Sequence, residues 1–536
     1  MSQNQKQKTG RSLAGIAGIV AIATLISKLF GLIRQQAIAA AFGVGVVADA
    51  YNYAYAIPGF FLILLGGING PFHSAIVSVL AKKPKSEAAP LVETVTTLVG
   101  GILLVLTAVL ILLAGPFMDL IYPDLSPQVK SLAIQQLQIM APMALLAGLI
   151  GVGFGTLNAA DMYWLPSVSP LFSSITVIIG LGILALQLGK QVTTPEYAIL
   201  GAQVLAWGTL SGAILQWLVQ VIAQWRAGMG TLRLRFDLSR PGVKEVMQVM
   251  GPATLSSGML QINLQTALFF ASAIPSAAAA LNYTVLLVQT PLGIISNMIL
   301  VPFLPVFSKL AAPENWSDLK IRIRQGMILT AISMLPLSAI MVTLAFPIVR
   351  LVYERHAFNR EASQLVASVL IASSSGMFFY LGRDVLVRVF YALGDGETPF
   401  RISIINIFLN AILDYLFVGI GPFGAPGLAL ATVVVNFTSM VALLWLLDRK
   451  LKGLNWQEWV IPILGLVASS VEAGGISWVV TQIYQQFLPT KTLFSQLCQL
   501  GLAAGAGLAV FFVLTSWLNI PEFEMFTAKI RQKFVK

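Results

Sequence analysis

Long apolar segments bounded by polar or charged residues recur along the whole chain. A helix of about 20 apolar residues is long enough to cross the hydrocarbon core of a bilayer, and fourteen segments reach this length. They lie at 13–42, 48–80, 90–118, 129–157, 165–188, 197–225, 243–272, 278–308, 322–352, 363–393, 401–420, 425–447, 457–484 and 494–518. The pattern therefore predicts an all-α polytopic membrane protein with 14 transmembrane helices.

Basic residues fall on alternate loops between these segments. Lys and Arg concentrate at 6–11, 82–85, 226–244, 309–324, 449–452 and 529–536, whereas the other loops hold few. Because cytoplasmic loops carry an excess of Lys and Arg, we expect both termini to be cytoplasmic, as an even number of spans requires.

A weak internal repeat indicates how the spans are grouped. "DAYNYAYAIPGFFLILLGGINGPFHSAIVSVLAKK" resembles "AALNYTVLLVQTPLGIISNMILVPFLPVFSKL" six spans later, in the same orientation. Parallel repeats of this kind form two lobes with a binding site at their interface. The expected divisions are a cytoplasmic tail 1–12, an N-lobe 13–226, a cytoplasmic linker 227–242, a C-lobe 243–449, two further helices at 456–518 and a tail 519–536.

Composition excludes several functional classes. The chain of 536 residues is 57% hydrophobic and 10% charged, against about 25% charged in soluble domains. Its net charge of +11 is typical of basic loops that face anionic lipid, so no nucleic-acid partner is expected. One cysteine precludes an internal disulfide, and no motif for metal, nucleotide or nucleophilic chemistry is present. We expect no cofactor and no catalysis, and the sequence is compatible with a monomer.

Two cations interrupt the first apolar segment. Lys28 and Arg34 lie where a charge costs about 2.5–3.5 kcal/mol on insertion scales. On an ideal helix they are about 120° apart, so both can border one wide polar cavity. Asp49 opens the next segment and is a candidate partner for Arg34. The alternative is that both cations extend to lipid headgroups at an interface.

Uncharged polar residues inside other segments are further candidates. Asn69 and His73 lie in the second segment, Asn263 in the seventh and Gln289 in the eighth. Each can instead serve as an interhelical hydrogen bond. Asp414, near the end of the eleventh segment, is expected at the interface.

Four stretches resemble a known family. They are "SKLFGLIRQQAIAAAFGVGVVADAYNYAYAIP", "GPATLSSGMLQINLQTALFFASAIP", "VRLVYERHAFNREAS" and "VRVFYALGDGETPFRISIINIFLN". In this order they are similar to the MurJ/MviN family, the lipid II flippases of peptidoglycan synthesis and cell wall biogenesis. The resemblance implies the fold of the multidrug, oligosaccharidyl-lipid and polysaccharide exporters, with two pseudo-symmetric six-helix lobes in a V and two C-terminal helices that form a lipid-tail groove.

The resemblance also implies roles for residues. Lys28 and Arg34 stand at the family's basic positions, which are thought to hold the substrate's pyrophosphate, and Asp49 stands at its acid. Lys28 replaces a more usual Arg, which keeps the charge and loses the planar fork. The predicted substrate-binding set is Arg34, Lys28, Asp49, Asn69, His73, Asn263 and Gln289.

The chain departs from the family pattern at two places. The second segment, "IPGFFLILLGGINGPFHS", has no Arg, and Val285-Leu286 occupy the places of an Asp-Arg pair. The main hypothesis is a flippase that moves lipid II across the bacterial inner membrane by alternating access. The alternatives are an exporter of another lipid-linked oligosaccharide, a cation-coupled drug exporter and a non-transporting scaffold for envelope assembly.

Overall fold

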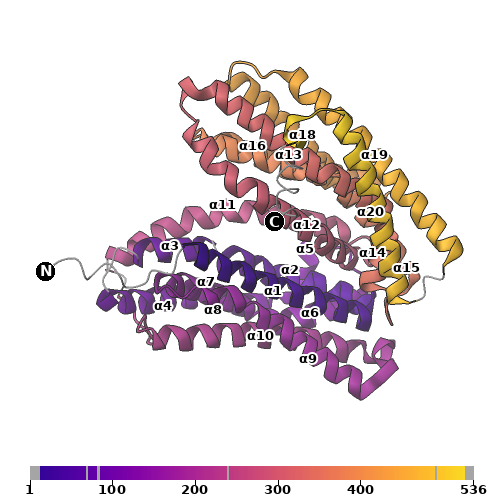
Figure 1. Ribbon diagram of the computed structural model, residues 1–536. Helices are drawn as coiled ribbons and strands as arrows, with labels where there is room; N and C mark the ends of the chain where they lie inside the picture. The colour runs from indigo at the N-terminus through magenta and orange to yellow at the C-terminus, as the bar shows by residue number, and fades with distance from the viewer. Residues whose placement is uncertain are drawn as a thin grey trace. The chain divides into compact units, whose positions relative to one another are not determined.

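The computed structural model describes residues 13–67, 70–80, 85–237, 239, 241–488 and 492–524. Within these ranges the regular structure is helical, without strands. The chain divides into two compact units, unit 1 (Met1–Gln265) and unit 2 (Thr266–Lys536) (Figure 1).

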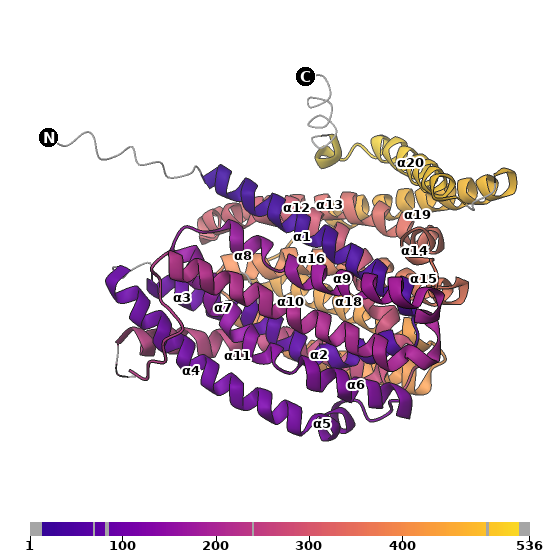
Figure 2. The ribbon, with the colours of Figure 1, turned by 90° about the horizontal axis from the view of Figure 1, so that it is seen from below.

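Unit 1 is built from helices that run alongside one another (Figure 2). They are α1 (Leu13–Phe42), α2 (Val46–Gly66), α3 (Pro71–Leu80), α4 (Lys85–Leu112), α5 (Ala114–Ile121), α6 (Pro127–Met140), α7 (Met143–Ala159), α8 (Trp164–Val168), α9 (Leu171–Leu188), α10 (Ala198–Arg226) and the first part of α11 (Pro241–Ala271). Helix α7 packs against α2, α3, α4 and α10, so it forms the centre of this unit.

Glycines allow the close packing of α7. A methyl group on Gly151 would overlap the backbone carbonyl of Leu65 in α2, and one on Gly153 would overlap the side-chain oxygen of Gln220 in α10. Small residues let helix backbones approach closely inside membranes, where packing rather than hydrophobicity drives helix association. The glycine content of α7 therefore follows from its central position.

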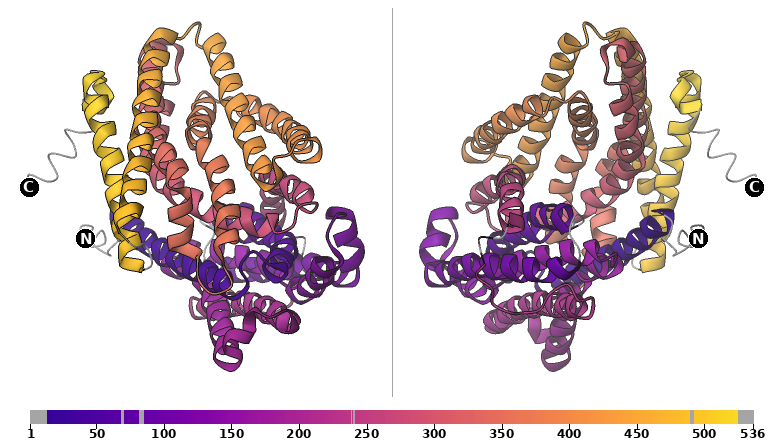
Figure 3. Two further views of the ribbon diagram at one scale, coloured as in Figure 1. Left: turned by 90° about the vertical axis from the view of Figure 1, so that its right-hand side faces the viewer. Right: turned by 90° about the vertical axis from the view of Figure 1, so that its left-hand side faces the viewer.

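Unit 2 contains the end of α11 and the helices that follow it. They are α12 (Ala277–Lys309), α13 (Trp316–Thr343), α14 (Ala345–Tyr353), α15 (Arg360–Ser375), α16 (Met377–Ala392), α17 (Glu397–Asp414) with a π-helical turn (Tyr415–Ile420), α18 (Gly424–Lys450), α19 (Trp456–Phe487) and α20 (Leu493–Trp517). Helices α19 and α20 lie side by side at one edge of this unit, and α19 packs against α13 (Figure 3).

The two units share an order of elements. Helices α4 and α13 both have 28 residues, and the short helices α5 and α14 follow them. The next two helices form a bent pair in each unit, α6 with α7 and α15 with α16, and both pairs bend by 41°. The bends coincide with Pro142 and Gly376, which precede α7 and α16, as expected for residues that interrupt helical hydrogen bonding.

Buried tyrosine pairs also match between the units. In unit 1 the rings of Tyr53 and Tyr122 lie 4.9 Å apart, and in unit 2 those of Tyr283 and Tyr353 lie 5.0 Å apart. All four side chains are buried. Tyr53 and Tyr283 belong to the two Asn-Tyr pairs of the sequence repeat, so the repeat aligns residues that make the same contact in each unit.

The membrane-spanning character of the chain follows from its helices. Among the described residues, nine helices are long and apolar enough to cross a membrane, or up to eleven if each bent pair is one span. Each of the fourteen expected segments falls on one helix or on consecutive helices. The all-helical membrane fold is confirmed, and the count of fourteen spans stays a prediction.

Candidate functional site

The two cations of the first segment lie on one helix, α1. Arg34 is partly buried, and no described protein group accepts a hydrogen bond from its buried Nε. Its guanidinium is close enough to the Tyr55 phenol of α2 for an electrostatic interaction. Lys28 is exposed. Arg34 is thus a cation inside an apolar unit with hydrogen-bonding capacity still available.

The first turn of α2 carries the expected acid. Asp49 is buried and interacts electrostatically with Tyr53, one turn further along α2. Its expected pairing with Arg34 stays a prediction. The ring of Tyr122 lies 4.9 Å from that of Tyr53. The Tyr122 hydroxyl donates to Gln265 Oε1 at 2.7 Å, and Gln265 Nε2 donates to the Ala56 carbonyl at 2.9 Å. Gln265 of α11 therefore links α11 to α2 and to Tyr122, the residue after α5.

His73 of α3 also has an interhelical partner. Its Nε2 lies 2.7 Å from Nδ2 of Asn158 on α7. With the Asn158 amide donating, Nε2 accepts and the ring proton is on Nδ1, which is buried and has no hydrogen-bond partner among the described residues. Asn69 lies outside the described residues, and Asn263 lies on α11 with its side chain outside what is described.

Unit 2 contains charged residues that are absent from the predicted substrate-binding set. Arg383, Asp384 and Arg388 lie on α16 and form what we term the α16 charge cluster. Asp384 interacts electrostatically with both arginines, and also with Tyr380, which is hydrogen-bonded to the predicted site residue Gln289 of α12. Three charges within "RDVLVR" in an apolar segment were a signal available in the sequence. Gln289 is thus connected to this cluster through Tyr380.

The α16 charge cluster is held by neighbouring helices. Arg383 Nε donates to Ser439 Oγ of α18 at 3.2 Å, and Asn406 Nδ2 of α17 donates to the same oxygen at 3.2 Å. Arg383 Nη1 lies 4.0 Å from Asp384 Oδ1, and the Asp384 side chain is partly exposed. Two arginines and one acid leave this face of α16 with a net positive charge.

Asp414 of α17 is completely buried within the protein, and Asn410 Nδ2 donates to its Oδ2 at 2.6 Å. The π-helical turn Tyr415–Ile420 follows it. Its expected place at the membrane interface stays a prediction.

Unit 2 also contains an apolar cavity of about 280 Å³. It lies between α13, α15 and α19, with Val342, Val467, Val471 and Gly474 among its lining residues. A cavity of this size and apolar lining suits hydrocarbon better than a charged group.

The arrangement of helices is shared with solved polytopic membrane proteins. A solved inward-facing multidrug resistance MATE family transporter of the MOP superfamily aligns with a TM-score of 0.59 and 18% identity, over 81% of this chain and 99% of that one, so the two chains have a similar fold. A solved structure of the lipid II flippase MurJ, in an inward closed conformation, aligns with a TM-score of 0.74 and 23% identity, over 93% and 98% of the two chains.

The family follows from the sequence comparisons. The family described as "Lipid II flippase MurJ" matches residues 38–498. A probable lipid II flippase MurJ of Synechocystis sp. is 59% identical over 527 residues, 98% of each chain, and one of Rhizobium tropici is 27% identical over 95% of each. The chain belongs to the MurJ family of lipid II flippases, which confirms the resemblance found in the sequence.

Proposed function

We propose that this chain is a flippase that moves lipid II, a polyprenyl-diphosphate-linked sugar precursor, across the cytoplasmic membrane for peptidoglycan synthesis. The relationship to relatives named as lipid II flippases extends over nearly the full chain. The observation that carries the proposal within the molecule is Arg34, an intramembrane guanidinium with free hydrogen-bonding capacity. No bond of the substrate is made or broken, so the function is transport.

Arg34 suits the headgroup of such a substrate. A diphosphate is polyanionic, and a guanidinium binds phosphate oxygens through two parallel hydrogen bonds. Lys28 adds a point charge on the same helix. The cost of holding these cations within the membrane is offset when the anionic headgroup occupies the site, which favours binding over a merely structural role.

The repeated architecture supports alternating access. We propose that the two units are pseudo-symmetric six-helix lobes, like the parallel repeats of other transporters. The matching bent pairs and tyrosine contacts support the repeat. In this arrangement the α16 charge cluster supplies the cations of the C-lobe. On α12 the place of the family's Asp-Arg pair is taken by Val285-Leu286, and Val285 is 47% exposed.

The lipid tail needs a separate, apolar surface. We propose that α19 and α20 form the tail groove, and the apolar cavity between α13 and α19 supports this assignment. The proposed topology is a multi-pass inner-membrane protein, functional as a monomer, with cytoplasmic termini and a cytoplasmic linker at 227–242.

Rescue of growth tests the function. In a bacterium depleted of its own lipid II flippase, the chain should restore growth, and Arg34→Ala should abolish rescue at unchanged membrane abundance. Losing one charge-assisted contact costs about 1.5–3 kcal/mol, or roughly ten- to more than a hundredfold in affinity. Arg34→Lys should rescue partially, because a point charge still attracts phosphate.

Arg401→Ala is the matched control. Arg401 is an exposed arginine whose described ion pair is with Glu397, and the substitution should leave rescue intact. Full rescue by Arg34→Ala would show that the charge is structural. Failure of the unmodified chain to rescue, with translocation of another polyprenyl-diphosphate glycan in vesicles, would favour an exporter of that glycan.

A further inference from the structure

The segment that follows α10 is fixed to α4 by a buried acid. Glu93 of α4 is 6% exposed, and its Oε1 accepts hydrogen bonds from Thr231 N at 3.0 Å and Thr231 Oγ1 at 2.7 Å. Its Oε2 forms an ion pair with Arg235 Nε at 2.9 Å. The Arg235 backbone N–H donates to Thr97 Oγ1 at 3.0 Å. Four polar contacts thus hold residues 231–235 along one side of α4.

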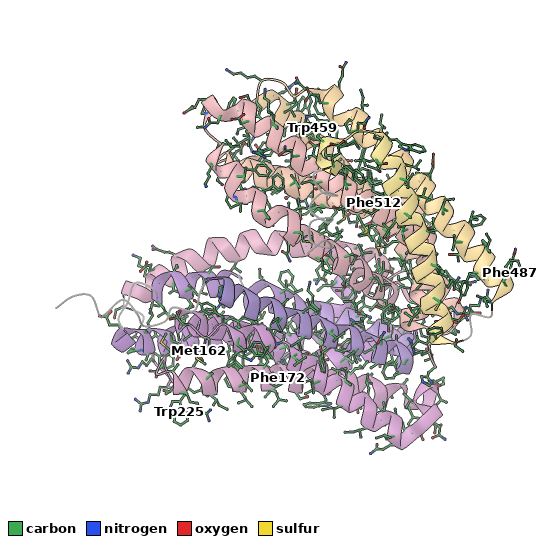
Figure 4. The ribbon with its side chains drawn as sticks, in the orientation of Figure 1. Met162, Phe172, Trp225, Trp459, Phe487 and Phe512 are labelled. Carbon is green, nitrogen blue, oxygen red and sulfur yellow. The ribbon has the colours of Figure 1, made fainter. Side chains whose placement is uncertain are left out.

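The alternation of the sequence "TLRLRFD" gives this segment two faces. In an extended chain successive side chains point to opposite sides, and Thr231 and Arg235 face α4. The apolar side chains that alternate with them are exposed: Leu232 is 58% exposed, and Leu234 and Phe236 are each 78% exposed. Trp225, at the end of α10, is 62% exposed and lies on the outer surface of unit 1 (Figure 4).

The position of Glu93 along α4 sets the depth of the segment. The 28 residues of α4 span about 42 Å at 1.5 Å per residue, about 12 Å more than a hydrocarbon core of about 30 Å. Glu93 lies about 12 Å from the start of the helix, and no charged residue occurs between Glu93 and Asp119. With this excess length placed at the Lys85 end of α4, Glu93 and the segment it holds lie where hydrocarbon meets headgroups.

Basic residues accompany the exposed apolar ones. Arg226 and Arg233 are exposed, and Arg235 is committed to Glu93. The only exposed acid in residues 225–237 is Asp237, at the end of the segment. Aromatic side chains are enriched at membrane interfaces, and basic clusters beside spans attract anionic lipids.

We propose that residues 225–236 form an interfacial anchor that binds anionic phospholipid. Trp225, Leu234 and Phe236 enter the boundary between headgroups and acyl chains, while Arg226 and Arg233 contact lipid phosphates. The contacts of Glu93 hold the anchor at constant depth. In the proposed topology this anchor occupies the cytoplasmic leaflet. Its partner is a lipid surface rather than a protein, because α4 beside it presents lipid-facing side chains such as Val105, which is 65% exposed.

Spin labels measure the depth directly. Cys498 is the single cysteine, so Cys498→Ser gives a background for Phe236→Cys and, as a matched control at the exposed charged residue that follows it, Asp237→Cys. In nanodiscs that contain anionic phosphatidylglycerol, a nitroxide at 236 should be relaxed mainly by lipid-soluble oxygen, and one at 237 mainly by a water-soluble nickel complex. Equal accessibility of both labels to the nickel complex would overturn the proposal and leave the face for a soluble protein.

The charge dependence tests the lipid class. Replacing phosphatidylglycerol with neutral phosphatidylcholine should raise the nickel accessibility of the label at 236. The double substitution Arg226→Gln/Arg233→Gln should remove this lipid dependence, since each interfacial arginine contributes roughly fivefold to the preference for an anionic surface. An unchanged response in the double variant would overturn the role of the arginines.

A second readout needs no label. Native mass spectrometry of the full chain extracted from mixed vesicles should detect fewer retained phosphatidylglycerol molecules in Arg226→Gln/Arg233→Gln than in the Arg401→Gln control, whose exposed arginine is paired with Glu397. Equal retention by the two variants would contradict the proposal. Because neither readout measures flipping, both outcomes are independent of the proposed transport function.

Discussion

Helices α7 and α16 hold equivalent places in their units and differ in chemistry. Each is the second half of a pair bent by 41°. Helix α7 has no charged residue, and 13 of its 17 residues are buried. Helix α16 carries the α16 charge cluster, and 8 of its 16 residues are buried. The repeat thus preserves the scaffold, while one copy serves as a packing core and the other presents charge.

The cations of unit 1 lie elsewhere, on α1. That helix packs mainly against α8 and α9, and its charged positions Lys28 and Arg34 are exposed or only partly buried. The charges of α1 have few neighbours, those of α16 have polar partners such as Ser439, and the crowded apolar centre of unit 1 offers neither on α7. Local packing and available polar partners thus decide which helix of each unit can hold a charge.

The largest effect is expected at the glycines of the two bent helices. Gly151→Ala in α7 should destabilise the fold by about 3 kcal/mol, the upper end for overpacking, because the new methyl overlaps the backbone of Leu65. Gly382→Ala in α16 should be nearly neutral, since its methyl meets the flexible Met440 sulfur at 2.8 Å. Thermal unfolding in detergent and membrane abundance measure both. Equal melting temperatures would mean that α7 and α16 are packed alike.

The α16 charge cluster should govern affinity for the substrate. Arg383→Gln removes one charge-assisted contact of about 1.5–3 kcal/mol and should weaken binding of a polyprenyl diphosphate roughly tenfold or more. Binding is measured with the purified protein in nanodiscs, and Arg401→Gln, an exposed arginine paired with Glu397, is the control. Unchanged affinity at normal abundance would mean that the protein cations that bind the substrate lie on α1 and not on α16.

The acid of the cluster should have the opposite effect. Asp384→Asn leaves two arginines without their neighbouring carboxylate. Because the Asp384 side chain is partly exposed, the change is modest, about two- to fivefold tighter binding of the diphosphate lipid. The same nanodisc titration measures it. Weaker binding would show that Asp384 positions Arg383 instead of opposing the anion.

The acids in the turns after α16 and α7 should contribute differently to the pH dependence of stability. Burial raises the pKa of Asp395, after α16, but hydrogen bonds from Lys450 at 2.6 Å and from Thr398 outweigh it, and the net pKa lies below its usual range. A depressed pKa stabilises the fold above the ordinary pKa of about 4, and the gain is lost as the pH falls through the folded-state value.

Asp395→Asn should therefore lower the melting temperature slightly at pH 7, and the difference should shrink as the pH falls below the ordinary carboxyl pKa of about 4. Asp161, exposed in the turn after α7 and bonded to Tyr163, is the control, and Asp161→Asn should have no effect at neutral or acidic pH. A pH-independent difference for Asp395→Asn would assign its effect to packing.

The helices were predictable because hydrophobic periodicity and length are local properties. The Asn-Tyr pairs predicted a repeat, and the structure adds the contacts of Tyr53 and Tyr283. The partner of His73 was not predictable, since Asn158 lies 85 positions away and has no distinguishing pattern. The α16 charge cluster was missed because its segment is apolar on average, although "RDVLVR" was visible.

The central position of α7 has a consequence for how the chain is made. Helices α2, α3 and α4 precede it, but the α10 residue Gln220, which covers Gly153, is synthesised 67 positions later. At about 5–20 residues per second, one face of α7 stays open to lipid or to the insertion machinery for roughly 3–13 s. A chain released before α10 is complete would enter the membrane with the Gly153 face of α7 uncovered. Packing of α10 against α7 is therefore the step that completes the fold of unit 1.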